Sequence, residues 1–405
     1  EILADAAKYD ASCASSGGEK RSAGRGLGSA TGQGICHAFT PDGRCVSLLK
    51  ILLTNFCIYD CAYCASRRSS NVKRARFTVE EVVRLTLDLY RRNCIEGLFL
   101  SSGIARSADD TMADLVRVAK SLRTEHAFHG YIHLKTIPGA SPELIAEAGL
   151  YADRLSMNVE LPSDASLQAL APEKSSTDIK RGLASTRLHI ESARQPTRSG
   201  RTRPPRFAPA GQSTQMIVGA DQSSDVEVLR ASAGLYASYA LKRIYYSAFS
   251  PTGHASPRLP QQAVPLLREH RLYQADWLLR FYGFSLGELE TVLPGGMLDL
   301  SMDPKLAWAL AHRGLFPVDV NQASRDMLLR VPGLGVRVVD RIIAARRHSR
   351  LRLADVARLT SAIRRVRPFI VTADWRPGAL LDDARLRQRL TAKPQQLAFA
   401  LASPC

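Results

Sequence analysis

The sequence has no uninterrupted apolar run of the roughly 18 residues that a transmembrane helix requires. Its first residues, EILADAAKYDASCASSGGEK, lack the basic segment and apolar core of a secretory signal. Aromatic residues make up only 7% of the chain, and no cluster of them indicates a stacking platform for single-stranded nucleic acid. No Gly-x-Gly-x-x-Gly follows the first expected strand, which argues against a dinucleotide-binding sheet. We therefore expect a cytoplasmic protein without a membrane anchor.

What the sequence does contain is positive charge and cysteine. Its 405 residues are 45% hydrophobic and 23% charged, as in globular proteins, and long enough for one large and one smaller domain. The net charge is +17, and many of the positively charged residues are arginines, which favours a polyanionic partner. Eight cysteines without a secretory signal indicate reduced thiols, with metal or redox use of any tight cluster.

Alternating apolar and amphipathic stretches predict an α/β fold. The expected strands are 46–54, 97–102, 131–137, 154–161, 214–219 and 243–248. Helix start signals lie between them: capping boxes at Thr78–Glu81 and Ser224–Glu227, and Pro142 after Ser141. Strands that alternate with helices pair in parallel with right-handed crossovers. Six such units predict a partial (βα)6 barrel of the TIM type.

Composition divides the chain further. Residues 1–45 are rich in Gly and Ser and predict a flexible lead-in. Residues 46–255 carry the barrel pattern, interrupted by a basic, proline-containing stretch, about 187–211, that predicts a mobile loop. The alternation then stops, and residues 256–405 predict a smaller all-helical domain without a convincing strand.

The cysteine cluster is the first specific motif. Cys57, Cys61 and Cys64 follow the first strand with C-x3-C-x2-C spacing, so three thiolates can converge from one loop. Soft sulfur ligands select iron–sulfur clusters or zinc. A complete cubane normally takes four cysteines, so three leave one iron open to a ligand. The alternative is a zinc knuckle with His37 or another cysteine as fourth ligand, but no second ligand pair follows Cys64.

This loop, with the aromatic Tyr63 before its last cysteine, resembles the signature of the radical S-adenosylmethionine (SAM) superfamily. The resemblance implies that the open iron chelates SAM, which is reductively cleaved to a 5′-deoxyadenosyl radical. It also implies cofactor contacts at the ends of later strands. The residues at these positions are Ser101, Ser102, Gly103, Asn158, Glu160 and Gly219. The glutamate common at the second strand end in the superfamily is absent here.

The cysteines upstream of the motif are candidates for a second metal site. Cys13, Cys36 and Cys45, with His37 beside the second, could hold an auxiliary cluster or zinc. They could equally be unconnected, because free cysteine is often a small buried hydrophobe. Their spacing matches no compact metal motif.

The second specific motif is Val331-Pro-Gly-Leu-Gly335, preceded by an apolar helix from 323 to 329 and followed by another helix. Gly333 and Gly335 permit a tight turn, and the N–H groups that begin the next helix favour an anion. Residues 321–345 resemble a helix–hairpin–helix motif, which grips nucleic-acid phosphates without reading bases. Residues 330–376 hold twelve arginines against three aspartates. The expected phosphate contacts are Arg337, Arg341, Arg346 and Arg347.

Several stretches together resemble a family of radical SAM proteins assigned to DNA modification or repair. They are LADAAKYDASCASSG, GICHAFTPDGRCVSLLKILLTNFCIYDCAYC, GLFLSSGI, VGADQSSDVEVL and YYSAFSP. The resemblance implies DNA as partner, an external electron donor, and association with a uracil-DNA-glycosylase-like repair protein. It implies no defined reaction. The alternatives are a radical SAM enzyme acting on RNA and a non-catalytic DNA-binding scaffold with a structural metal.

Overall fold

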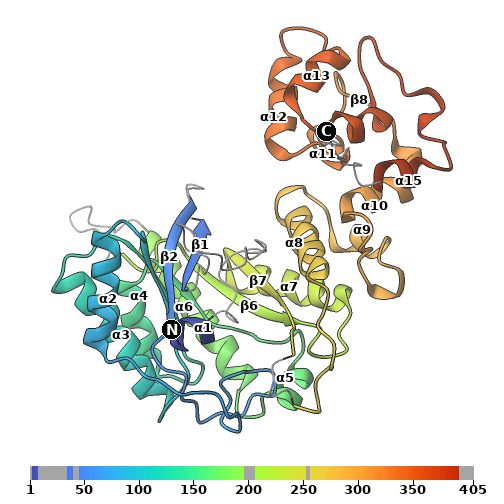
Figure 1. Cartoon of the computed structure of the whole chain (residues 1–405). Coiled ribbons are helices and arrows are strands. Elements are labelled where there is room, and N and C mark those ends of the chain that lie inside the picture. The colour runs from blue at the N-terminus through green and yellow to red at the C-terminus, as the bar shows by residue number, and fades with distance from the viewer. Residues whose placement is uncertain (1, 8–33, 40–44, 196–205, 252–255, 392–405) are drawn as a thin grey trace, which may run out of the picture. The chain divides into compact units, whose positions relative to one another are not determined.

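The computed structural model describes residues 2–7, 34–39, 45–195, 206–251 and 256–391 (Figure 1). The chain divides into two compact units, Glu1–Tyr273 and Gln274–Cys405, which we describe separately. The sequence predicts a boundary near residue 255, whereas the two compact units meet between Tyr273 and Gln274.

The first unit is built on a sheet that, within the described residues, has seven strands in sequential order. The strands are β1 (Ile35–Phe39), β2 (Cys45–Leu52), β3 (Gly97–Ser101), β4 (Tyr131–Lys135), β5 (Arg154–Ser156), β6 (Gln212–Val218) and β7 (Arg243–Ala248). β1 pairs antiparallel with β2, and every later pair is parallel. The sheet curls into a half-barrel (Figure 1). This confirms the six expected strands and the α/β partial barrel.

The helices α2 (Val79–Arg91), α3 (Ala108–Thr124), α4 (Pro142–Tyr151), α6 (Ser176–Arg194) and α7 (Asp225–Tyr239) cover the outer face of the sheet (Figure 1). The short helices α1 (Ile2–Ala6) and α5 (Asp164–Leu170) also belong to this unit, and α8 (Leu266–Phe281) spans the boundary between the units. Both expected capping boxes are present, at Thr78 and Ser224, and Ser141 caps α4 ahead of Pro142. Each start signal therefore sits where its helix begins.

The strand register separates two faces. Leu49, Leu98 and Ile132 are in register on β2, β3 and β4 and fully or almost fully buried on the helix side. The alternate residues face the interior of the half-barrel, where Phe99 packs edge-on against His133 and His133 contacts the Ser156 hydroxyl at 3.0 Å. Because buried polar groups need partners, an interior lined this way is suited to polar ligands.

The structure differs from the expected loops in two places. Within the predicted flexible lead-in, the described residues form α1 and β1. Within the predicted loop of 187–211, α6 continues to Arg194, helped by the Arg187–Glu191 pair one turn apart at 2.7 Å. Residues 196–205 of that loop lie outside the description.

The second unit is mainly helical, as expected. Its α-helices are α9 (Leu286–Glu290), α10 (Pro304–Ala311), α11 (Arg325–Arg330), α12 (Val336–Ala345), α13 (Leu353–Leu359), α14 (Ile363–Val366) and α15 (Leu386–Thr391). Short 3-10 helices are Pro294–Gly296, Arg313–Leu315, Arg367–Phe369 and Gly378–Leu380. Two strands that we did not expect, β8 (Val318–Asp319) and β9 (Ile370–Val371), pair in parallel. No described helix in either unit combines the length and apolarity needed to cross a membrane.

Candidate active site

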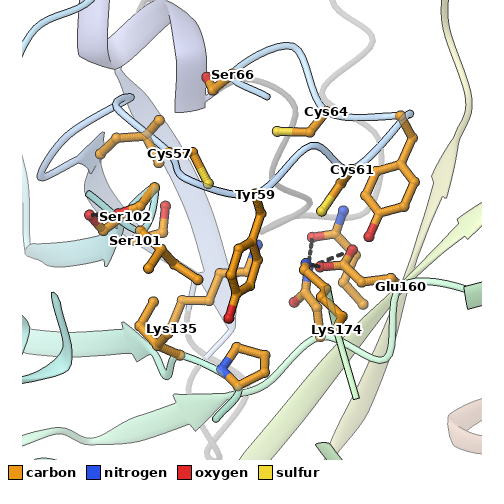
Figure 2. A pocket seen from close by; sticks show the side chains of 18 of the residues that line it. Cys57, Tyr59, Cys61, Cys64, Ser66, Ser101, Ser102, Lys135, Glu160 and Lys174 are labelled. Atoms are coloured by element: carbon orange, nitrogen blue, oxygen red, sulfur yellow. Dashed lines mark hydrogen bonds and ion pairs between the residues drawn. The ribbon is translucent and has the colours of Figure 1, made fainter. Parts of the chain in front are cut away.

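The loop that follows β2 brings the three cysteines of the motif to one cavity. Cys57, Cys61 and Cys64 line a space of about 180 Å³ (Figure 2). Tyr59 projects from the same loop into this space, between Cys57 and Cys61 in the view of Figure 2. All three expected cysteines therefore line one cavity.

Burial disfavours the thiolate form of two of the three cysteines. Burial raises the pKa of Cys61 to about 12, and it also raises the pKa of Cys64. A buried thiolate becomes favourable when a metal cation supplies the compensating charge. Three cysteine sulfurs that line one cavity fit a cubane cluster, whose irons prefer soft thiolate ligands.

The end of β3 lies against the cysteine loop. Ser101, Ser102 and Gly103 all line the cavity, and the Gly103 N–H donates to the Thr54 carbonyl at 2.7 Å. A Cβ atom at Gly103 would lie 2.4 Å from the Phe56 carbonyl oxygen. This position therefore needs glycine because two backbone segments approach closely.

The opposite wall carries a buried ion pair that follows β5. Glu160, with a positive φ of 68°, accepts from Lys174 Nζ at 2.6 Å (Figure 2). Asn158 Nδ2 lies 3.4 Å from both Glu160 Oε2 and Gln215 Oε1. Burial acts to lower the pKa of Lys174, but the Glu160 carboxylate, Tyr63 and Cys61 raise it well above its ordinary value. Lys174 is thus held as an ammonium beside the cysteines.

Tyr63 completes that wall. Its ring lies 5.8 Å from Lys174 Nζ, and its hydroxyl is buried without a hydrogen-bond partner among the described residues. Desolvation raises the pKa of Tyr63, with the Glu160 charge adding to the effect. The unpartnered hydroxyl is a polar atom available to a bound ligand.

Lys174, Tyr59, Lys135 and Gln215 line the cavity but were not expected from the sequence. Lys135 and Gln215 stand on β4 and β6 on the inward face, so strand alternation could have suggested them. Lys174 lies between α5 and α6, where no periodic pattern marks it.

Gly219 does not join the site. It is absent from the described lining of the cavity and has a φ of 77°, and a Cβ there would lie 2.3 Å from Val264 Cγ2. Its glycine is explained by the packing of the Val264 segment.

The upstream cysteines are separated. In the β1–β2 register Cys36 pairs with Leu48, while Cys45 pairs with Phe39, three positions away, so the two side chains point to opposite faces. Accordingly Cys36 is buried and Cys45 is exposed. Cys13 lies outside the described residues. Among the residues that are described, no group of three or more His, Cys, Asp or Glu side chains is arranged to hold a metal ion as it stands.

In the second unit, α11 and α12 are joined by the expected glycine turn. Gly333 has a φ of 89°, and a Cβ there would lie 3.0 Å from Val366 Cγ2. Gly335 is the N-cap of α12 and supplies no side-chain cap. Lys305 Nζ donates to the Leu334 carbonyl at 2.6 Å from beneath the turn.

The four expected phosphate contacts are not equivalent. Arg337, Arg341 and Arg347 are exposed. Arg346 is half-buried and donates to the carbonyls of Val320 and Ala323, at 3.1 and 2.7 Å. Its guanidinium is engaged within the unit, so the exposed arginines of this set are Arg337 and Arg341 on α12 and Arg347 just after it.

Comparison with known proteins gives a family match for part of the first unit. Residues 51–191 match the family model of the Radical SAM superfamily. No curated protein matches the chain.

Several solved structures are similar at low identity. The hydrogenase maturase HydG from Carboxydothermus hydrogenoformans has 14% identity and a TM-score of 0.43, covering 56% of this chain and 49% of its own. Methylornithine synthase (PylB) has 15% identity and a TM-score of 0.42, with coverages of 57% and 61%. Coproporphyrinogen III oxidase (HemN) from Escherichia coli has 13% identity and a TM-score of 0.35, with coverages of 55% and 50%. The chain thus spans about half to three fifths of these proteins.

Proposed function

We propose, from the match of residues 51–191 to the family model of the Radical SAM superfamily, that this protein is an enzyme that cleaves SAM and directs the resulting radical at DNA. Enzymes of the superfamily use a [4Fe–4S] cluster and SAM. When bound and reduced by an external donor, the cluster would supply the electron that splits SAM into methionine and a 5′-deoxyadenosyl radical, which takes a hydrogen atom from the substrate.

One observation carries the proposal: Cys57, Cys61 and Cys64 line a single cavity whose other wall is polar. In the proposed site Cys57, Cys61 and Cys64 would hold the cluster and leave it open to SAM. Ser102 and the backbone around Gly103 would bind the methionyl group, and Asn158 and Glu160 would bind the ribose or the carboxylate. Tyr63 and the paired Lys174 would limit the access of water on that side of the cavity.

Loss of any one of the three cysteines tests the cofactor assignment. Anaerobic reconstitution with iron and sulfide should give the wild type a cluster whose electron paramagnetic resonance (EPR) spectrum changes with SAM, and 5′-deoxyadenosine after reduction. Cys57→Ala, Cys61→Ala and Cys64→Ala should lose both signals. The control is Cys94→Ala, because Cys94 is exposed and outside the cavity. Bound zinc, or a cluster spectrum that ignores SAM, would instead support a structural metal.

Nucleic acid as the target is supported by the second unit. The Pro332–Gly335 turn leads into α12 with Arg337, Arg341 and Arg347 exposed. Arginine next to a helix N-terminus suits phosphate binding and carries no base information. A base within a duplex would have to leave the stack to reach a cavity, which is least costly for damaged or mispaired bases.

The salt dependence of DNA binding tests this assignment. Arg337→Gln and Arg341→Gln should each weaken duplex binding and reduce the slope of log affinity against log salt by about one. Arg84→Gln removes the same charge from an exposed site on α2 and should leave the slope unchanged. Tighter binding to matched RNA, with product formed only on RNA, would transfer the proposal to RNA.

The reaction on the target is open to direct measurement. Mass spectrometry of nucleosides from DNA incubated with the reduced enzyme and SAM should reveal a changed base or sugar. An external electron donor is required, and a uracil-DNA-glycosylase-like protein is the proposed repair partner.

A further inference from the structure

Arg74 lies just beyond the cysteine loop and binds it at several points. Its Nη1 donates to the carbonyls of Asn55 and Ser66, the latter at 2.8 Å. Its Nη2 donates to the Arg67 carbonyl at 2.6 Å and to both the carbonyl and the hydroxyl of Ser70 at 3.0 Å. One guanidinium thus satisfies four main-chain carbonyls.

These carbonyls come from both ends of the cysteine loop. Asn55 precedes Cys57 by two residues, and Ser66 follows Cys64 by two. The Arg74 side chain therefore links the two ends of the segment that carries all three thiols.

The side chain of Asn55 also links the start of the cysteine loop to the segment around Arg74. Its side chain is buried, donates to the Lys73 carbonyl at 2.7 Å and accepts from the Ala75 N–H at 2.7 Å. The residues on either side of Arg74 are thereby fixed against the start of the loop, which limits where the guanidinium can lie.

Arginine suits this position for a chemical reason. It offers five N–H donors in a rigid plane, whereas lysine offers three around one point. Lysine could reach some of these carbonyls but could not span both ends of the loop at once. Carbonyls left without partners in a half-buried loop would favour its rearrangement.

We propose that Arg74 is a positioning residue that holds the cysteine loop in its iron-binding shape before the cluster is present. The inference rests on the proposed function, because it assigns the loop to the [4Fe–4S] cluster. Groups that orient metal ligands from outside typically contribute about 10- to 100-fold to metal affinity.

The test compares the reconstituted full-length wild type with Arg74→Lys and Arg74→Gln. Iron release to a chelator should be at least about tenfold faster in Arg74→Gln, with Arg74→Lys between it and the wild type. The reduced cluster of Arg74→Gln should also show a weaker change in its EPR spectrum when SAM is added. The matched control is Arg76→Gln, because Arg76 pairs with Asp114 at 2.8 Å rather than with the loop.

Amide hydrogen exchange of the iron-free proteins separates the inference from the cofactor assignment. The Ala62 N–H donates to the Leu170 carbonyl at the end of α5, and the Cys64 N–H donates to the Cys61 carbonyl within the loop. Their exchange should accelerate in Arg74→Lys while exchange in β3 stays as in the wild type. Exchange and iron release that match the Arg76→Gln control would overturn the inference. A wild type that binds no cluster would defeat the proposed function, and exchange would then decide the role of Arg74.

Discussion

The ion pair between Glu160 and Lys174 is the residue-scale feature that most distinguishes the cavity. The two side chains are 8% and 13% exposed and lie 2.6 Å apart, next to Tyr63 and the cysteines. A buried pair of this kind adds little net stability over an apolar pair, but breaking it leaves one charge uncompensated.

Lys174→Met is therefore expected to destabilise the first unit by about 3 kcal/mol or more, measured by urea denaturation at neutral pH. The exposed pair Asp164–Lys180, at 2.8 Å, gives the control. Asp164→Asn should cost at most about 1 kcal/mol. Glu160→Gln combined with Lys174→Met should recover most of the loss. Equal effects of Lys174→Met and Asp164→Asn would show that the cavity pair is well solvated.

Some residues of the site could be predicted from the sequence, and others could not. The three cysteines and Gly103 were predicted because they sit in a spaced motif or at a strand end, and they line the cavity. Lys174 and Arg74 were missed because their roles depend on which distant backbone they meet. Gly219 was assigned to the site for its place after a strand, but its glycine is required by Val264.

At the scale of elements, a buried lysine of α10 donates a hydrogen bond to the turn between α11 and α12. Lys305 is 7% exposed, and its Nζ lies 4.7 Å from the Tyr282 ring. Burial lowers the pKa of Lys305 to about 7, with Asp303 opposing and Arg365 adding to the shift. The amine under the turn thus titrates near neutral pH.

This titration predicts a pH-dependent stability for the second unit. The unfolded lysine keeps its proton up to about pH 10.5 and the folded one only to about 7, so the unfolded state binds more protons between these values. Stability should therefore rise with pH from about 7 toward 10.5, and Lys305→Met should remove that rise. All three tryptophans lie in residues 274–405, so tryptophan fluorescence in urea reports this unit.

The exposed Lys73 provides the control for this measurement. Lys73→Met should retain the rise in stability above pH 7. A Lys305→Met protein that keeps the same rise would assign it to another group. A loss of DNA binding in Lys305→Met at unchanged stability at pH 7 would further indicate that the lysine shapes the turn.

Helices and strands could be predicted where the sequence pattern that marks them lies within the element itself. Capping boxes at Thr78 and Ser224 and long alternating runs located helices and strands correctly. β1 was missed because ICHAF is short and lies in a Gly- and Ser-rich context. β8 and β9 have two residues each, too few for any periodic pattern, and they exist because Val318 and Ile370 meet in the folded unit. The sequence predicted a loop from about residue 187, but α6 continues to Arg194, and the pairing of Arg187 with Glu191 one turn away supports the helix there.

At the scale of the whole molecule, the proposal divides two tasks between two units. The first unit contains the cysteine cavity, and the second carries the basic turn and helix. The net charge of +17 favours association with nucleic acid but is spread over the chain, so it contributes mainly non-specific attraction. The division of tasks implies that each can be impaired separately.

Arg337→Gln combined with Arg341→Gln should raise KM for DNA, because these side chains are proposed to hold phosphates and touch no reacting atom. The maximal rate of DNA-dependent 5′-deoxyadenosine formation should stay within about twofold at saturating DNA and low salt, as expected when only ground-state binding is lost. Cys61→Ala should do the opposite, retaining DNA affinity while abolishing product. The double arginine variant should also keep the iron content of the wild type and its EPR response to SAM. If it lowered the maximal rate as strongly as it raised KM, the basic helix would act in the chemical step, and the proposed separation of binding from chemistry would be wrong.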